Sequence, residues 1–178
     1  MLKKIVVIGP ESTGKSTLCE QLAAHFKTAW VPEYARTFLE THGTDYTYED
    51  LFSIAEGQIR TEDEMTQRVS SATENCKQLF IDTDLYVIKV WSEFVFNKCD
   101  NRMLSQIAAR QYDLYLLCNT DLEWVKDNLR EYPDLETRDK LFHFYKDAMV
   151  NQSIPWVIIQ GNHDERLQLA IEAVNNLD

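Results

Sequence analysis

The first residues able to do chemistry form a glycine-rich segment near the N-terminus, GPESTGKST at 9–17. Gly9, Gly14, Lys15 and Ser16 occupy the four fixed positions of the pattern G-x-x-x-x-G-K-[ST]. A β-rich run precedes this segment and a helical pattern follows it, so several backbone N–H groups and the positive end of a helix dipole should surround one point. Such a point suits a triphosphate, and the segment is predicted to be a phosphate-binding loop.

The residues of this loop have separate expected roles. The two glycines allow positive φ angles and a close approach of the backbone to phosphate. Lys15 can bridge the β and γ phosphates of ATP as a catalytic cation, and the Ser16 hydroxyl can ligate Mg²⁺. The residues predicted to bind the nucleotide are Gly9, Glu11, Ser12, Thr13, Gly14, Lys15, Ser16 and Thr17. The predicted cofactors are therefore ATP and Mg²⁺.

Two aspartates end and follow a buried β-rich run in QLFIDTDLY. Ligands bind at the carboxyl edge of a parallel sheet, and a carboxylate at the end of the apolar run commonly holds the magnesium of a nucleotide. Asp82 has that position, so it is the predicted metal ligand together with Ser16. Asp84 lies two residues further on, where it can cap the next helix or contact the acceptor hydroxyl or its ribose. The residues alone leave both interpretations of Asp84 open.

A third polar cluster lies in TAWVPEYARTF, where a second strand should meet its helix. In a phosphotransferase, a carboxylate at this edge can accept the proton of the acceptor hydroxyl while an arginine offsets developing charge. Glu33 is the first candidate for this base, with Arg36 beside it. Glu33 can instead favour the helix N-terminus and pair with Arg36 on the surface. Trp30 and Tyr34 can stack on a planar base or fill the core.

The elements that position these residues alternate along the chain. Short β-rich runs and longer segments of helical period indicate an α/β, three-layer P-loop NTPase fold, a parallel sheet with helices on both faces. The runs predicted as strands are 3–8, 28–32, 78–82, 113–118 and 155–160. The segments predicted as helices are 15–26, 33–43, 47–76, 84–97, 101–110, 121–130, 135–152 and 163–177. The 178 residues are expected to form one domain, with mobile parts at 47–76 and 121–138.

Composition narrows the range of partners. The formal net charge of −11 disfavours nucleic acid, because no basic patch is visible along the sequence. No apolar run approaches the roughly 18 residues of a membrane span, and the N-terminus enters a strand too early for a signal peptide, so a cytoplasmic location is expected. The dispersed cysteines should be reduced, and the histidines lack metal-ligand spacing. The sequence does not determine the oligomeric state.

Five segments, in this order, resemble the nicotinamide riboside kinase domain of NadR-type proteins. They are GPESTGKST at 9–17, PEYAR at 32–36, AEGQIR at 55–60, FIDTD at 80–84 and NTDLEWVKDNLRE at 119–131. The first is common to P-loop proteins at large, whereas the order and spacing of the others point to this family. The resemblance implies strand order 2-3-1-4-5 and ATP-dependent phosphorylation of a nucleoside at its 5′ hydroxyl. Nicotinamide riboside is the implied acceptor, and NAD biosynthesis the implied setting.

The resemblance also implies further site residues. Arg130 and Arg138, on a lid around 121–138, would close over the triphosphate and supply charge to the transition state, unless they are simply solvated on an exposed helix. Gln58 and Arg60 would line the acceptor pocket, although polar residues of such a helix are often only solvated.

Two departures from the family pattern are visible. The family has a tryptophan directly before the Glu-Tyr pair, where this chain has Pro32. Because strand side chains alternate, Trp30 faces the same side as Pro32 and can supply a displaced aromatic wall. Bifunctional members carry an adenylyltransferase domain ahead of the kinase, and 178 residues leave no space for one, so a stand-alone kinase is expected.

Two other functions remain compatible with the phosphate-binding loop. One is a kinase for another small acceptor such as a nucleoside monophosphate, which would need an extra arginine cluster that the sequence does not reveal. The other is a nucleotide-dependent regulatory or binding module with slow hydrolysis. A module of that kind has no use for a base at Glu33 aimed at an acceptor hydroxyl.

Overall fold

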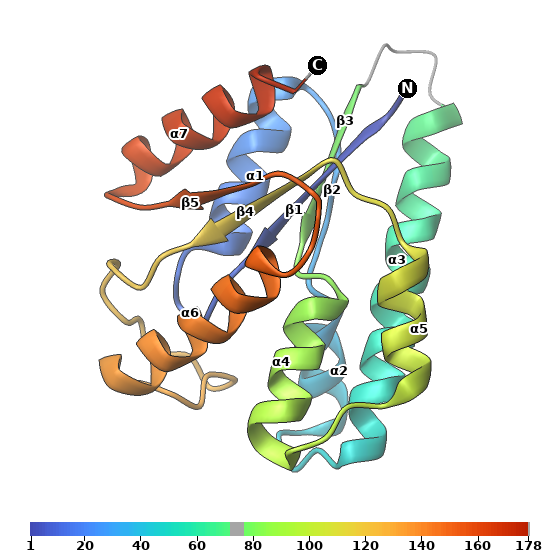
Figure 1. The fold of residues 1–178 in the computed structure, drawn as a ribbon, viewed down its shortest axis with the longest axis vertical. Helices are drawn as coiled ribbons and strands as arrows, with labels where there is room; N and C mark the ends of the chain where they lie inside the picture. Colours follow the sequence, from blue (N-terminus) through green and yellow to red (C-terminus); the bar gives the residue numbers. More distant parts are fainter. Residues whose placement is uncertain (72–76, 178) are drawn as a thin grey trace.

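The computed structural model describes residues 1–71 and 77–177. Its strands are β1 (Lys3–Ile8), β2 (Trp30–Val31), β3 (Gln78–Asp82), β4 (Leu114–Cys118) and β5 (Trp156–Ile159). Its helices are α1 (Lys15–Phe26), α2 (Tyr34–His42), α3 (Tyr48–Ser71), α4 (Leu85–Phe96), α5 (Asn101–Ala109), α6 (Leu135–Val150) and α7 (His163–Asn175). Figure 1 shows the strands side by side with helices around them.

The five strands form one parallel sheet in the order β2-β3-β1-β4-β5. The predicted fold class and strand order are therefore confirmed. In the register of the sheet, Val7 of β1 lies beside Asp82 of β3 and Leu116 of β4. The carboxyl ends of the three central strands thus meet at one edge, where the phosphate-binding loop leaves β1.

Helices cover both faces of the sheet, which explains why the central strands are apolar without alternation. Residues 5–8 of β1 are fully buried. Ile5 and Val7 pack with α1 and α7, which lie together on one side of the sheet in Figure 1. Val6 and Ile8 pack with residues of α3, α4 and α6 on the other face. A third apolar cluster joins α2, α3, α4 and α5.

The predicted helix over 121–130 is wrong. Residues 121–133 form an irregular segment between β4 and α6. Three of its backbone donors find partners on the phosphate-binding loop instead of within a helix: Val125 N–H donates to Ser12 Oγ, and the N–H groups of Glu131 and Tyr132 donate to the Glu11 carboxylate. These distant side chains satisfy the backbone, so the segment need not become helical.

Other boundaries differ by a few residues. The strand predicted over 28–32 is reduced to Trp30–Val31, and Pro32, which has no N–H for a ladder, follows it directly. The helix predicted over 47–76 is present as α3 up to Ser71, and the rest of that prediction lies outside the described residues. Within the described ranges, no helix combines the length and apolarity needed to cross a membrane.

Three of the four cysteines lie within the described part of the chain. Cys19 and Cys118 are free and buried, and Cys99 is free and half-buried. No disulfide joins these three cysteines, and Cys76 lies outside the described residues.

Candidate active site

The phosphate-binding loop curls at the end of β1 into the first turn of α1. Gly9 has φ 140°, and a Cβ at this position would lie 2.7 Å from the carbonyl oxygen of Cys118. Gly14 caps α1 with φ 77°, in the left-handed region. Any larger residue would be strained at these two positions, so the geometry explains why both are glycine.

Contacts within the loop and from α7 hold this curl. Lys15 Nζ donates to the Pro10 carbonyl at 2.8 Å, and Thr13 Oγ1 donates to the same oxygen at 2.7 Å. Arg166 of α7, only 2% exposed, donates from Nη1 to the Thr13 carbonyl at 3.1 Å and from Nε to the Gly161 carbonyl at 2.8 Å. Arg166 thereby supports the loop from behind, a role that a single arginine on a helix does not reveal in sequence.

Asp82 ends β3 beside this loop. It is 1% exposed, and its Oδ2 has no hydrogen-bond partner among the described residues. Burial and then the negative charge of Glu33 raise the pKa of Asp82 to about 6, while Lys15 and a hydrogen bond with the Ser16 hydroxyl act in the opposite direction. A buried carboxylate with a free oxygen beside a hydroxyl and a lysine has the chemistry of a cation ligand at a phosphate site.

Asp84 is turned into the protein instead of the cavity. Its Oδ1 accepts the N–H of Tyr86 at 2.9 Å and so caps α4, and its Oδ2 accepts the hydroxyl of Tyr115 at 2.8 Å. Burial raises the pKa of Asp84 to about 7, against these hydrogen bonds. The helix-capping interpretation describes this geometry, and the carboxylate fixes the start of the helix that carries part of the cavity wall.

A cavity of about 210 Å³ opens in front of the loop. It is lined by residues 9–17 on one side, by α2, α4 and α6, and by residues 129–132. Glu33 lines it from the N-cap position of α2, where its side chain makes no capping hydrogen bond. Arg36 also lines it, but pairs with Asp127 at 2.9 Å rather than with Glu33. The structure therefore brings Glu33 and the phosphate-binding loop to the same cavity.

Part of the cavity wall is aromatic. Trp91 and Phe94 of α4, Tyr132 and Tyr145 all line it, and the Phe94 and Tyr132 rings meet edge to face at 5.4 Å. Sequence reasoning missed these residues. Trp91 and Phe94 are spaced i, i+3 on an apolar helix, a pattern that also describes core packing. The only sequence signal was their location on the helix that follows Asp84.

Four other residues predicted from sequence for the acceptor do not line the cavity: Trp30, Tyr34, Gln58 and Arg60. Trp30 packs against the core beside α1 and α7 and does not line the cavity. Gln58, 2% exposed, accepts the Tyr34 N–H at 2.8 Å, and the Arg60 guanidinium lies 5.8 Å from the Tyr34 ring centroid. Tyr34, Gln58 and Arg60 thus form a group between α2 and α3, outside the cavity lining, and Tyr34 directly follows Glu33 in sequence.

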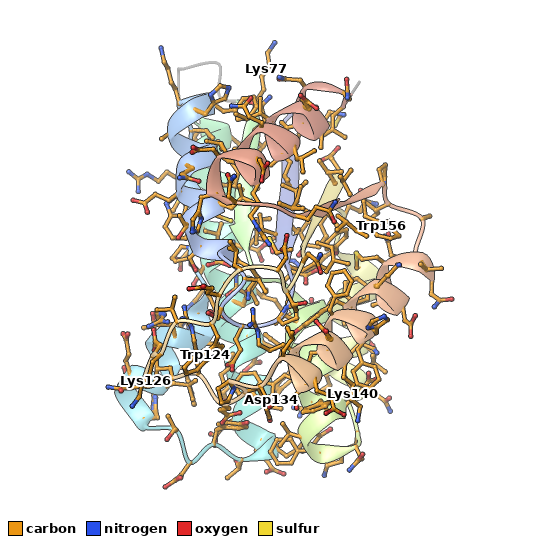
Figure 2. The ribbon with its side chains drawn as sticks, turned by 90° about the vertical axis from the view of Figure 1, so that its left-hand side faces the viewer. Lys77, Trp124, Lys126, Asp134, Lys140 and Trp156 are labelled. Carbon is orange, nitrogen blue, oxygen red and sulfur yellow. The ribbon has the colours of Figure 1, made fainter. Side chains whose placement is uncertain are left out.

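The segment between β4 and α6 crosses the loop. Arg130 lines the cavity, with Nη1 3.3 Å from Ser12 Oγ. Arg138, 2% exposed at the start of α6, donates to the carbonyls of Ser12 and Leu122, both at 3.3 Å. Figure 2 shows Trp124 and Asp134 of this segment in the lower half of the view, together with Lys140 of α6. Both predicted lid arginines therefore contact the phosphate-binding loop.

A strand, a glycine-rich loop and a helix of this geometry, on a parallel sheet in the order 2-3-1-4-5, define a protein of the P-loop NTPase fold. A family model described as an AAA domain, AAA_28, matches residues 4–166. The chain belongs to this family.

The chain is also similar to curated proteins and solved structures. It is 25% identical to the trifunctional NAD biosynthesis/regulator protein NadR of Escherichia coli (strain K12) and to its namesake in Salmonella typhimurium (strain LT2), over 99% of this chain and 43% of each relative. The chain thus spans less than half the length of these relatives. The resemblance inferred from the motifs is confirmed.

Solved structures show the same fold. A NadR protein in complex with NR matches with a TM-score of 0.80 and 24% identity, covering 99% of this chain and 49% of that one. A thymidylate kinase from Ehrlichia chaffeensis matches with a TM-score of 0.69 and 11% identity, covering 97% and 98%. At these identities the likeness concerns the fold.

Proposed function

We propose that the protein is an ATP-dependent kinase that transfers the γ phosphate to the 5′ hydroxyl of a nucleoside. The observation that carries this proposal is that Glu33, the phosphate-binding loop and four aromatic side chains line one cavity. An acceptor whose base packs on these aromatic side chains would present its hydroxyl between the loop and the carboxylate. A hydrolytic switch would need neither the aromatic side chains nor the carboxylate.

The loop residues bind and orient the triphosphate in this proposal. The backbone N–H groups of the loop and the N-terminus of α1 receive the phosphates, and Lys15 places its charge on the oxygens that become more negative during transfer. Glu33 accepts the proton of the acceptor hydroxyl. Its side chain makes no hydrogen bond to any described residue, so its oxygens are available to the acceptor.

The residues present fit a magnesium ion. Asp82 has a buried oxygen without a partner among the described residues, and the Ser16 hydroxyl lowers the pKa of the same carboxylate. These two side chains would hold the ion, which would neutralise charge on the triphosphate. The proximity of Glu33 to Asp82, which raises the pKa of Asp82, also favours a cation at this place.

The segment 121–138 acts as the lid in this proposal, within a single kinase domain. Its docking on Glu11 and Ser12 brings Arg130 to the cavity, where its guanidinium can offset negative charge on the transferring phosphate and its neighbours exclude water. Arg138 holds the base of the segment on the Ser12 carbonyl. Arg138 thus acts on the transferring phosphate only through the loop, whereas Arg130 acts on it directly.

Nicotinamide riboside is the proposed acceptor. This choice is supported by the similarity to NAD biosynthesis proteins named NadR and by the fold shared with a NadR protein in complex with NR. The cavity agrees with a nucleoside rather than a nucleoside monophosphate, because Lys15, Arg36 and Arg130 are the basic side chains that line it among the described residues. Arg36 is engaged with Asp127, so a second phosphate-binding arginine cluster is absent from this lining.

The proposal is tested by measuring ADP formation by the purified protein in the presence of ATP and magnesium. Nicotinamide riboside, common nucleosides, nucleoside monophosphates or no acceptor are added in turn. We expect strong stimulation by nicotinamide riboside and none in the Lys15→Ala variant. If only nucleoside monophosphates stimulated ADP formation, the acceptor would be a nucleoside monophosphate and the proposed acceptor class would be wrong. Acceptor-independent hydrolysis, with bound nucleotide and no stimulation, would contradict the kinase assignment.

A further inference from the structure

A chain of hydrogen bonds fixes the tryptophan of the aromatic wall. The indole Nε1–H of Trp91 donates to the Tyr46 hydroxyl at 2.8 Å, and that hydroxyl donates to the Glu131 carboxylate at 3.1 Å. The Tyr46 and Trp91 rings also meet edge to face, with centroids 4.6 Å apart. Tyr46 precedes α3, whereas Glu131 belongs to the segment that crosses the phosphate-binding loop. Three regions far apart in sequence are thereby joined.

The same segment is held at its other side by the phosphate-binding loop. The Glu11 carboxylate accepts the N–H of Glu131 at 3.1 Å and also the N–H of Tyr132. The Ser12 hydroxyl accepts the N–H of Val125 at 2.8 Å. Glu11 and Ser12 stand at variable positions of the G-x-x-x-x-G-K pattern, so phosphate binding does not by itself require these residue types. Their side chains are used to dock the segment.

We propose that Tyr46 and Glu131 are positioning residues that hold Trp91 in the wall of the acceptor cavity, and that Glu11 keeps Glu131 in place for this task. The wall is complete only when residues 125–132 are docked on the phosphate-binding loop. The inference rests on the proposed function in one respect, namely that this cavity receives the acceptor.

The direction of the hydrogen bonds supports this arrangement. An indole N–H can only donate, so a half-buried tryptophan needs an acceptor, and the Tyr46 oxygen supplies one while its own proton goes to a carboxylate. Hydrogen bonds that end on a charged group are stronger than neutral ones and polarise the chain. A tyrosine hydroxyl is protonated at neutral pH and can act as the donor, and burial, together with Glu131, raises the pKa of Tyr46 further.

The first test is Tyr46→Phe, which keeps the ring and removes both hydrogen bonds. We expect the KM for nicotinamide riboside to rise roughly 3- to 10-fold, with kcat and the KM for ATP nearly unchanged, since one charge-assisted interaction is lost. Tyr48→Phe is the matched control, because the Tyr48 hydroxyl makes no hydrogen bond to any described residue and its ring packs on Phe96. An equal rise in both variants would overturn the proposal.

Glu131 and Glu11 test the rest of the chain of contacts. Glu131→Ala should raise the KM for the acceptor as Tyr46→Phe does, whereas Glu131→Gln keeps an oxygen acceptor and should restore most of the parent value. Glu11→Ala should raise the same KM. The double variant of Glu11→Ala with Tyr46→Phe should show less than the product of the two single effects, because both act on one wall. If the two effects on the acceptor KM multiplied fully in the double variant, Glu11 and Tyr46 would not act on the same wall.

An optical readout separates this inference from the proposed function. The difference in emission between the parent and Trp91→Phe isolates Trp91, and loss of its hydrogen bond in Tyr46→Phe should shift that emission without any ligand present. A protein without kinase activity would refute the proposed function and leave this optical test intact. Emission and acceptor KM that both match the parent in Tyr46→Phe would overturn the positioning role.

Discussion

Replacing Gly57 by alanine should destabilise the protein, although it removes a glycine from the interior of a helix. Gly57 is a buried residue of α3, and a Cβ there would lie 2.0 Å from Cε1, 2.2 Å from Cδ1 and 2.4 Å from Cζ of the Tyr34 ring. The ring therefore rests directly on the glycine. Helix propensity alone makes the opposite prediction, a stabilisation of about 1 kcal/mol.

The magnitude follows from the distance. Ordinary carbon contacts lie near about 3.5 Å or beyond, so the ring must move by more than about 1 Å. Overpacking of this kind typically costs about 1–3 kcal/mol, which against the propensity gain leaves a net destabilisation of up to roughly 2 kcal/mol. Tyr34 is the first residue of α2 and follows Glu33, so the displacement also moves the proposed base. A misplacement of about 1 Å can lower transfer by about 100-fold.

Urea denaturation and acceptor-dependent turnover measure the two effects. Ser53→Ala, at an exposed position of the same helix, is the control for helix propensity and should be neutral or mildly stabilising. Tyr34→Ala removes the ring and with it the clash. Gly57→Ala should therefore cost less stability when it is made in the Tyr34→Ala variant than when it is made in the parent. A Gly57→Ala variant that is about 1 kcal/mol more stable than the parent, with unchanged turnover, would refute the reasoning.

Three further substitutions address the site. Lys15→Ala should abolish phosphate transfer, because no other side chain of the loop carries a cation to the transferring phosphates; normal turnover would refute the assignment of the loop. Glu33→Gln should lower kcat roughly 100-fold or more while titration with AMP-PNP shows unchanged nucleotide binding, as expected for loss of a general base; an unchanged rate would remove that role. Arg166→Lys should lower the free energy of unfolding by roughly 2 kcal/mol and weaken nucleotide binding, since a lysine cannot reach both the Thr13 and Gly161 carbonyls with the fork of an arginine; stability equal to the parent would show that the loop does not depend on this support.

The parts of the fold that could be predicted from sequence are those that depend on local pattern. Residues 5–8 are buried by helices on both faces, so β1 reads as an uninterrupted apolar run leading into the phosphate-binding loop. Asp82 was found because it ends such a run at the ligand-binding edge of the sheet. The strand order came from the resemblance to a family, since pattern alone does not order parallel strands.

The parts that could not be predicted depend on contacts between distant residues. The pattern of the segment after β4 predicts a helix, but three of its backbone donors are taken by Glu11 and Ser12, more than a hundred positions earlier in the chain. Trp30 was placed correctly on a strand, yet alternation does not say which face carries the cavity, and the ring packs on the opposite side with α1 and α7. Trp91 and Phe94 have the i, i+3 spacing that core residues of a helix also have. Only the tertiary arrangement assigns them to the wall.

The central claim is that the γ phosphate of ATP reaches the 5′ oxygen of a nucleoside held in the aromatic cavity. Its most direct test is the mass balance of a reaction with γ-labelled ATP, magnesium and nicotinamide riboside, with the products identified by mass spectrometry. The account predicts one molecule of nicotinamide mononucleotide, labelled on its 5′ phosphate, for each ADP formed. Formation of ADP with the label only in inorganic phosphate would contradict it.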